Sequence, residues 1–376
     1  MRVAVIGGGQ LARMMQEAAS ALGIPLAALV EARDGSTGQV VPDAVVGAPD
    51  DEDRVRALAE RSAVLTFEHE HQATALLERL QAEGYSVQPS PAALLYARDK
   101  LAMRRRLGEL GVPIPHWRQI RSETDLEEFL AQHGGRAIVK TARGGYDGKG
   151  VRAVEKSEEV GDWLEAMAAG GVELLAEEQV DFTCEVAALL ARRPSGELRT
   201  WPVAETRQVD GVCSTVLAPA PDLDDRLAAR AQEIAEQIAV GLNVTGVLAV
   251  EMFLSGDRLT VNELAMRPHN SGHWTIEGAT TSQFEQHLRA VLDLPLGDTT
   301  PVAPHAVMVN LLGSVHEDPR HAYPEALGRY PEVKVHLYGK EVRPGRKLGH
   351  VTAIGEDLAE LESRAAGAVA VLKGVE

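Results

Sequence analysis

The chain has 376 residues, of which 45% are hydrophobic and 25% charged, a composition typical of globular proteins. At roughly 100–200 residues per domain, this length predicts two or three domains. The 38 Lys and Arg residues against 55 Asp and Glu residues give a formal net charge of −17, which argues against nucleic acid as the main partner. Two cysteines cannot form a disulfide framework, and no apolar run approaches the roughly 20 residues of a membrane span, so we expect a cytosolic protein.

The first part of the chain predicts a parallel α/β sheet, because strands alternate with helices. The elements, in chain order, are a strand at 2–6, a glycine turn at 7–9, a helix at Gln10–Leu22, strands at Leu26–Val30 and Val64–Phe67, and a helix at 74–83. The glycine turn, followed by Glu31 about 20 residues later, is also the pattern of a dinucleotide site. A nicotinamide-dependent oxidoreductase is therefore one alternative.

Two capped helices and a pair of prolines separate this part from the next. Ser90 and Asp99 are N-cap residues for helices that begin at Pro91 and Lys100, and Pro113 with Pro115 marks a boundary. A small α+β unit follows, with a helix at 124–132 and strands at 137–140 and Val151–Val154, and ends near residue 179. The last part predicts strands at 185–191 and 200–203, a helix at 223–240 closed by Gly241, strands on both sides of 255–258, strands at 306–311 and 333–337, and a helix at 357–372.

A glycine-rich loop follows Lys140, which ends an apolar strand. It consists of Gly144, Gly145, Tyr146, Asp147, Gly148, Lys149 and Gly150. A Walker A loop is excluded, because Lys149 is followed by glycine rather than a hydroxyl residue, and a strand rather than a helix comes next. A glycine loop between two strands can instead fold over phosphates and offer them backbone N–H groups. We expect such a flap here, and an ordinary long hairpin is the alternative.

Two glutamates lie in apolar strands on either side of a four-residue turn. Antiparallel pairing puts Glu251 opposite Asn262 or Glu263. Two carboxylates this close would repel each other and raise a pKa, unless a cation compensates them. Carboxylate oxygens suit Mg²⁺, which also bridges nucleotide phosphates. A single carboxylate paired with a lysine at an exposed edge is the alternative.

Two polar segments complete the motifs. The second strand runs into Arg267, His269, Asn270 and His273, residue types that are typical of a loop that holds a substrate. Lys340, Arg343, Arg346 and Lys347 fall within eight residues of an otherwise acidic chain. The more specific interpretation of this cluster is an anion-binding site, since arginine binds phosphate through two hydrogen bonds. A solvated turn is the alternative.

These segments, in this order, resemble the ATP-grasp superfamily and, more narrowly, the family of 5-(carboxyamino)imidazole ribonucleotide synthases. The most specific pieces are the turn at 7–11 and the segments 144–150, 262–274 and 340–350. The resemblance implies an ATP-grasp fold of α/β and α+β class. Its expected parts are a Rossmann-like parallel-sheet domain (1–98), a helical connector (99–115), a lid with the flap (116–179), and a C-terminal domain with the metal site and a β-rich tail (180–376).

The resemblance also implies the reaction. ATP phosphorylates bicarbonate to carboxyphosphate, which delivers CO₂ to the exocyclic amine of 5-aminoimidazole ribonucleotide in purine biosynthesis, with release of ADP and phosphate. Such an enzyme is an ATP-dependent ligase that uses ATP and Mg²⁺, acts in the cytosol, and is commonly a homodimer. An ATP-grasp ligase for another acceptor, such as an amino acid or formate, and a non-catalytic nucleotide-binding module are the remaining alternatives.

Residue roles follow from the same resemblance. Lys100 and Lys140 contact ATP phosphates, and the flap covers them. Asn262 and Gln208 belong to the nucleotide site, and Glu185 binds ribose. Adenine is framed by Glu177, Glu178, Gln179 and Val180, and Mg²⁺ is held by Glu251 and Glu263. The residues for 5-aminoimidazole ribonucleotide or bicarbonate are Tyr146, Asp147, Arg267, His269, Asn270, Lys340, Arg343 and Arg346, of which Tyr146, Asp147, Arg267 and His269 are the catalytic candidates. Two positions depart from the family pattern: Lys100 replaces a common arginine, and Gln208 replaces a common histidine.

Overall fold

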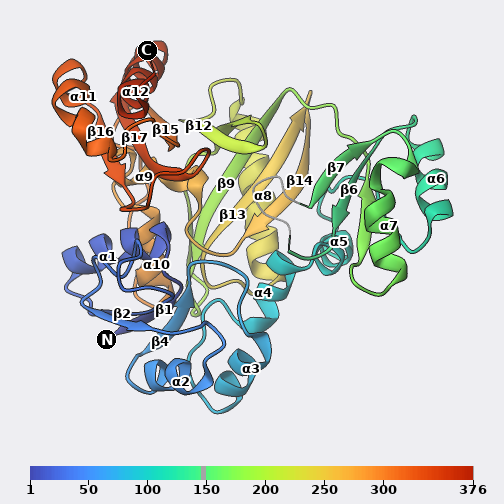
Figure 1. The fold of residues 1–376 in the computed structure, drawn as a ribbon, viewed down its shortest axis with the longest axis horizontal. Coiled ribbons are helices and arrows are strands. Elements are labelled where there is room, and N and C mark those ends of the chain that lie inside the picture. Colours follow the sequence, from blue (N-terminus) through green and yellow to red (C-terminus); the bar gives the residue numbers. More distant parts are fainter. Residues whose placement is uncertain (145–149, 376) are drawn as a thin grey trace.

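The computed structural model describes residues 1–144 and 150–375 (Figure 1). The N-terminal sheet is parallel, in the order β3-β2-β1-β4. Its strands are β1 (Val3–Ile6), β2 (Leu26–Val30), β3 (Asp43–Val46) and β4 (Val64–Phe67), and its helices are α1 (Gln10–Leu22), α2 (Glu52–Glu60) and α3 (Thr74–Ala82). Alternate residues of β1 face opposite ways: Ala4 and Ile6 pack with α2 and α3, whereas Val3 and Val5 pack with α1 and with α10 (Gln283–Val291).

A smaller antiparallel sheet, the lid sheet, has the order β5-β8-β6-β7. Its elements are β5 (Trp117–Ile120), α6 (Glu123–Gln132), β6 (Ala137–Thr141), β7 (Val151–Val154), η1 (Ser157–Val160), α7 (Gly161–Ala168) and β8 (Leu174–Glu177). Helices α4 (Pro91–Arg98) and α5 (Lys100–Glu109) connect it to the N-terminal sheet, and their N-caps are Ser90 and Asp99, as the sequence predicts. In Figure 1 the lid lies at one side of the molecule, beyond α5.

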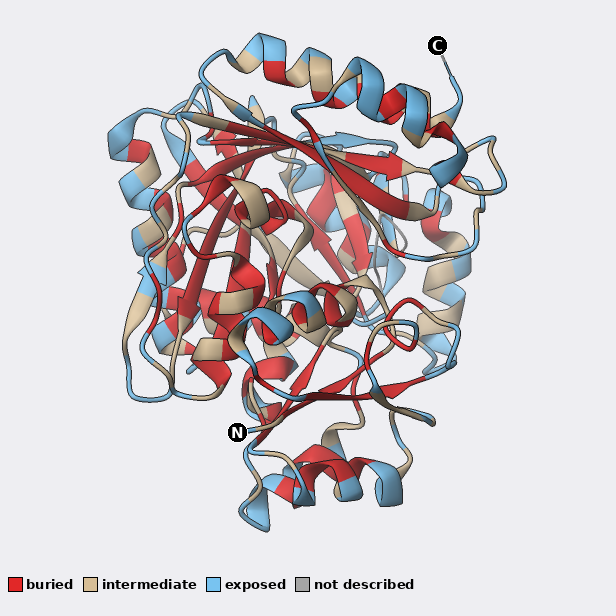
Figure 2. Ribbon diagram, turned by 90° about the vertical axis from the view of Figure 1, so that its left-hand side faces the viewer, coloured by how far each residue is buried: buried red, intermediate tan, exposed pale blue. Residues whose placement is uncertain are grey.

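The large sheet is antiparallel, in the order β14-β13-β9-β11-β12-β15-β17-β16, with β10 paired to β9. Its strands are β9 (Cys184–Arg192), β10 (Leu198–Thr200), β11 (Ala204–Val209), β12 (Val212–Ala218), β13 (Gly246–Ser255), β14 (Arg258–Ala265), β15 (His305–Leu312), β16 (Lys334–Leu337) and β17 (Lys347–Gly355). The remaining helices are α8 (Asp225–Gly241), η2 (Asn270–Gly272), α9 (Thr275–Gly278), α10, η3 (Pro319–Ala322), α11 (Tyr323–Arg329) and α12 (Leu358–Lys373). Figure 2 shows buried residues concentrated in the strands beneath these helices.

The structure corrects the sequence predictions at three places. Residues 201–203 form no strand, because Pro202 has no backbone N–H with which to continue the ladder; Trp201 before it is fully buried and donates its indole N–H to Thr281 O at 3.0 Å. Gly241 is the last residue of α8 rather than its stop. The basic segment ends in strand β17. The sequence analysis missed this strand, along with the strands β3, β5, β8, β11 and β12 and the helices α2, α7, α9, α10 and α11. Among the described residues, no helix is long and apolar enough to cross a membrane.

Candidate active site

Two acidic side chains face each other on β13 and β14. Glu251 pairs with Glu263 rather than with Asn262, because a bulge after Glu251 shifts the register by one residue. Burial, followed by the charges of Glu263 and Glu185, raises the pKa of the Glu251 carboxyl to about 8. The repulsion expected from the sequence is therefore present, and a cation beside this pair would relieve it.

Two lysines from other parts of the chain reach the same place. Lys100 Nζ, at the start of α5, lies 3.2 Å from Glu263 Oε1. Lys140, on the lid strand β6, donates from Nζ to Asn262 Oδ1 at 3.1 Å, and the same nitrogen lies 2.8 Å from Glu177 Oε2. Lys140 therefore links the lid sheet to the large sheet, Lys100 links α5 to the large sheet, and each of these cations contacts a carboxylate.

Glu177, at the end of β8, is buried between two cations. Arg104 Nε lies 2.7 Å from Glu177 Oε1, and the other Arg104 nitrogens donate to the carbonyl oxygens of Val261 and Asn262 at 3.1 and 2.8 Å. Burial alone would raise the pKa of the Glu177 carboxyl, but Arg104 and Lys140 outweigh burial and lower this pKa to about 2. The side chain of Glu177 is thus part of an ion-pair network, its backbone is paired with β5 and β6 in the lid sheet, and its predicted adenine contact stays a prediction.

The rest of the predicted adenine segment lies between β8 and β9. Glu178 Oε1 accepts a hydrogen bond from the His116 backbone N–H at 3.1 Å and lies 3.5 Å from Arg258 Nη2. Gln179 and Val180 follow outside any strand, where their backbone groups take no part in a sheet ladder. This extended connection between the lid sheet and the large sheet is suited to offering backbone N–H and C=O groups to a ligand.

The residues predicted at the ribose and nucleotide are neighbours in the large sheet. Glu185 on β9 pairs with Thr206 on β11, and the side chain of Gln208 hydrogen-bonds to the Glu185 carboxyl. Burial raises the pKa of Glu185, and the hydrogen bond from Gln208 lowers it in part. Because the charge of Glu185 also acts on Glu251, the structure brings Gln208 and Glu185 to the acidic pair.

The predicted substrate loop follows β14 and turns back over the acidic pair. Arg267 Nε lies 2.9 Å from Glu70 Oε1, in the loop after β4 of the N-terminal sheet. His269 Nε2 lies 3.8 Å from Glu251 Oε1. Burial and the charge of Arg267 lower the pKa of His269 well below its usual value, so this imidazole is neutral at pH 7. Asn270 begins the short helix η2.

The basic segment contacts helix α1, which packs beside the N-terminal sheet. Lys340 Nζ donates to the side-chain oxygen of Gln10, the first residue of α1. Arg343 Nη2 and Arg346 Nη1 lie 2.6 and 3.9 Å from Glu341 Oε2. The positive charges that the sequence places together are thus partly neutralised by the glutamate among them, which the sequence argument did not include.

The glycine turn before α1 contains a carboxylate of the protein itself. Glu68, after β4, accepts hydrogen bonds from the backbone N–H groups of Gly9 and Ala12. A Cβ added at Gly9 would lie 2.6 Å from Glu68 Oε1, and one added at Gly8 would lie 2.4 Å from a Glu31 oxygen. A pyrophosphate at this helix N-terminus would have to displace Glu68, so the turn does not support the nicotinamide alternative.

Five of the predicted flap residues lie outside the described part of the chain, and their roles stay predictions. They are Gly145, Tyr146, Asp147, Gly148 and Lys149. At the two ends of this segment, Gly144 and Gly150 have φ values of 81° and 73°, which favour glycine. The backbone N–H of Thr141 donates to Gly150 O at 3.0 Å, so this pair closes the base of the loop.

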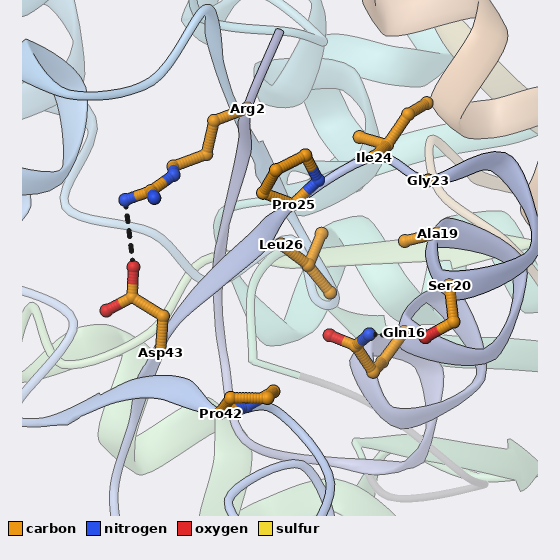
Figure 3. A pocket seen from close by; sticks show the side chains of 10 residues that line it. All are labelled: Arg2, Gln16, Ala19, Ser20, Gly23, Ile24, Pro25, Leu26, Pro42 and Asp43. Atoms are coloured by element: carbon orange, nitrogen blue, oxygen red, sulfur yellow. Dashed lines mark hydrogen bonds and ion pairs between the residues drawn. The ribbon is translucent and has the colours of Figure 1, made fainter.

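Cavities contribute little to locating the site. The cavity in Figure 3, about 330 Å³ in volume, lies beside α1 and β2 and includes the Arg2–Asp43 ion pair of 3.0 Å. No predicted site residue lines it. A second cavity, also about 330 Å³, is bordered by Lys340 together with Arg13, Glu341 and Arg320. The second one adjoins the predicted anion segment.

The donor set at the acidic pair fits Mg²⁺. Glu251 and Glu263 supply hard carboxylate oxygens, and the raised pKa of Glu251 marks a charge that needs compensation. Within residues 1–144 and 150–375, no group of three or more His, Cys, Asp or Glu side chains could hold a metal ion alone. The other ligands would therefore come from nucleotide phosphates and water, which is the usual way in which proteins bind Mg²⁺.

Three family profiles match the chain. They are described as a ribonucleotide synthetase preATP-grasp domain at 1–98, an ATP-grasp domain at 105–284 and a phosphoribosylaminoimidazole carboxylase C-terminal domain at 306–364. Proteins named N5-carboxyaminoimidazole ribonucleotide synthase from Mycobacterium bovis and Mycobacterium tuberculosis are 50% identical to the chain over 368 residues, which cover 96% of this chain and 86% of each relative. The chain belongs to the N5-carboxyaminoimidazole ribonucleotide synthase family.

Solved structures of this family share the fold. A synthetase from Thermus thermophilus is 39% identical with a TM-score of 0.88, and the match covers 98% of both chains. A synthase from Aspergillus clavatus, solved with ADP and 5-aminoimidazole ribonucleotide, is 32% identical with a TM-score of 0.89, and the match covers 100% of this chain and 99% of that one. The fold is an ATP-grasp fold and the chain is an ATP-dependent ligase, as the sequence resemblance implied.

Proposed function

We propose that the chain carboxylates 5-aminoimidazole ribonucleotide in purine biosynthesis. ATP and bicarbonate form carboxyphosphate, whose CO₂ is transferred to the exocyclic amine of the ribonucleotide, and ADP and phosphate are released. Relatives at 50% identity carry the name of this activity, and the Aspergillus clavatus relative was solved with ADP and this acceptor. The use of bicarbonate and Mg²⁺ is part of the proposal.

The observation that carries the proposal is the meeting of two lysines with two glutamates where the lid sheet joins the large sheet. Lys100 contacts Glu263, and Lys140 contacts Asn262, the residue before it. Nucleotide phosphates need cations on one side and a divalent metal on the other, and this place supplies both a pair of lysines and a pair of carboxylates. Mg²⁺ held by Glu251 and Glu263 would neutralise phosphate charge when ATP is bound.

The charged residues of the chain must neutralise the anionic substrates so that these can bind side by side. ATP, bicarbonate and the ribonucleotide are all negatively charged, so their encounter requires neutralisation. Arg267 contacts Glu70, and its charge also acts on Glu251, so its guanidinium is placed to hold bicarbonate by two hydrogen bonds. His269 is neutral, so it adds no charge to the site, and its Nε2 can take part in a hydrogen bond to a substrate group. Lys340, next to Gln10, is our candidate for the acceptor phosphate.

Release of ADP measures this proposal directly. The protein is mixed with Mg-ATP, and ADP is followed with bicarbonate and 5-aminoimidazole ribonucleotide each present or omitted. We expect full turnover only when both are present, together with ¹⁴C transfer from bicarbonate to the ribonucleotide. Turnover that instead requires an amino acid or formate would favour another ATP-grasp acceptor. Binding of ATP with no ADP release under any condition would favour a non-catalytic module.

Two further expectations stay predictions. A homodimer and a cytosolic location were both inferred from the sequence and its resemblance. Sedimentation equilibrium of the purified protein would measure the first. A single species at the monomer mass of 40.4 kDa would contradict it.

A further inference from the structure

A buried glutamine ties the substrate loop to α10. Gln283 Oε1 accepts a hydrogen bond from the His269 backbone N–H at 2.8 Å, and Gln283 Nε2 donates to the His269 carbonyl oxygen at 2.8 Å. The same nitrogen lies 2.9 Å from His273 Nδ1. The side-chain amide therefore pairs with both backbone groups of one residue, as a neighbouring strand would.

The hydrogen-bond donors and acceptors of this amide leave no other arrangement. The reverse orientation would set the NH₂ group against the N–H of His269 and the oxygen against its carbonyl. Burial and nearby positive charges lower the pKa of the His273 imidazole to about 3, so the ring is neutral, and in the tautomer protonated at Nε2 its Nδ1 accepts a hydrogen bond from the second amide N–H. Gln283 is fully buried, and the amide oxygen and both amide protons are used.

Gln283 is itself held in place. Its backbone N–H donates to Thr275 Oγ1 at 2.9 Å, and this hydroxyl donates to Gly272 O at 2.6 Å. The loop passes directly against the amide, since a Cβ added at Gly272 would lie 2.5 Å from Gln283 Oε1. Gln283 is the first residue of α10, directly after the N-cap Ser282, so a helix supports the amide from behind the loop.

We infer that Gln283 is the positioning residue of the substrate loop. It fixes the backbone of His269, and so sets where the side chains of Arg267 and His269 stand relative to Glu251. The inference rests on the proposed function, in which those two side chains hold the reacting groups. Misplacement of a reacting group by about 1 Å can cost roughly a hundredfold in rate. Because Gln283 is fully buried against the loop backbone, we expect its loss to lower kcat through the placement of His269 and Arg267.

The substitution Gln283→Glu keeps the shape and removes both amide protons. An ionised carboxylate would face the His269 carbonyl oxygen and His273 Nδ1, and it would have no proton to donate to either acceptor. We expect kcat for ADP release, at saturating substrates and pH 8.5, to fall roughly a hundredfold. A protonated carboxyl has one C=O and one O–H, and these reproduce the pairing with His269. Lowering the pH to 6 should therefore raise the ratio of variant to wild-type kcat by about tenfold, since burial raises the pKa of the introduced carboxyl.

The same helix offers a matched control. Gln286 is also fully buried, and its amide pairs with both backbone groups of Gly297 at 2.9 and 2.7 Å. The loop at 294–300 carries no predicted site residue. We expect Gln286→Glu to lose as much thermal stability as Gln283→Glu but to keep kcat within about threefold of the wild type, with no recovery at low pH.

A neutral variant covers the case in which Gln283→Glu does not fold. Gln283→Met has a similar length and no hydrogen bonds, and should lose kcat about as strongly at every pH. The positioning role is overturned if Gln283→Met keeps kcat within threefold of the wild type, or if Gln286→Glu loses as much kcat as the Gln283 variants. If the wild type itself does not need 5-aminoimidazole ribonucleotide for ADP release, the proposed function fails, whatever these variants do.

Discussion

Replacing Glu177 by glutamine tests the buried network behind the lysines. The change removes the negative charge between Arg104 and Lys140, which lie 2.7 and 2.8 Å from its oxygens. A pKa of about 2, against 4.5 for the free carboxyl, corresponds to about 3 kcal/mol at 1.36 kcal/mol for each tenfold change in proton affinity. Breaking a buried ion pair by removing one partner typically costs about 3–5 kcal/mol, which agrees.

Urea unfolding followed by circular dichroism at pH 7.5 measures this cost. We expect the free energy of unfolding of Glu177→Gln to be about 3–5 kcal/mol below that of the wild type. Asp181→Asn is the control, because the pair of Asp181 with Arg136 at 3.3 Å is exposed to solvent and should contribute only about 0–1 kcal/mol.

The pH dependence gives a second measurement of the same network. The folded-state pKa of Glu177 is lowered, so its contribution is fully present above pH 4.5 and is lost as the pH falls toward 2. The difference in unfolding free energy between the wild type and Glu177→Gln should therefore narrow between pH 5 and pH 3. A variant as stable as Asp181→Asn, or a difference that does not change with pH, would refute the reasoning.

Three other substitutions have separate readouts. Glu263→Gln should reduce turnover by at least roughly a hundredfold at limiting Mg²⁺ with an unchanged circular dichroism spectrum, and near-normal turnover would rule out a metal-ligand role. Arg346→Ala should raise the KM for 5-aminoimidazole ribonucleotide roughly ten- to a hundredfold, for a loss of about 1.5–3 kcal/mol, and should leave the KM for ATP nearly unchanged; a rise confined to ATP would show that the segment binds the other ligand. His287 is buried with a pKa of about 3, so its contribution to stability is present above pH 6.5 and is lost as the pH falls toward 3. Lowering the pH from 7 to 5 should cost the wild type about 2 kcal/mol that His287→Gln does not lose, and equal losses in urea unfolding would contradict this.

The sequence predicted the elements whose signals are local. Helix α1 has the predicted bounds, because its apolar residues recur at helical spacing and Gly23 ends it in a left-handed conformation. The caps Ser90 and Asp99 were found because a capping side chain lies beside the helix it caps. Strands β5, β8 and β12 were missed because short strands are defined by neighbours that lie far away in the sequence.

The candidate site was predicted in part for the same reason. The turn between β13 and β14 brought Glu251 near Asn262 or Glu263, but only the bulge decides between these two, and a bulge leaves no clear mark in the sequence. Arg104 had a visible signal, a charged residue three positions from both Leu101 and Leu107 on one helix face, yet its partner Glu177 is 73 residues away. Likewise Glu70 meets Arg267 only because the N-terminal sheet lies against the substrate loop.

The two glutamines of α10 have roles that the sequence alone does not distinguish. Gln283 and Gln286 are one turn apart, equally buried, and paired in the same way with backbone groups. Both are polar residues on the inward face of α10, an amphipathic helix that the sequence analysis did not predict. What separates them is the backbone on the other side of the amide, which is a predicted substrate residue for Gln283 and the connection after α10 for Gln286. The role of a positioning residue is therefore a property of its partner, and only the folded chain identifies that partner.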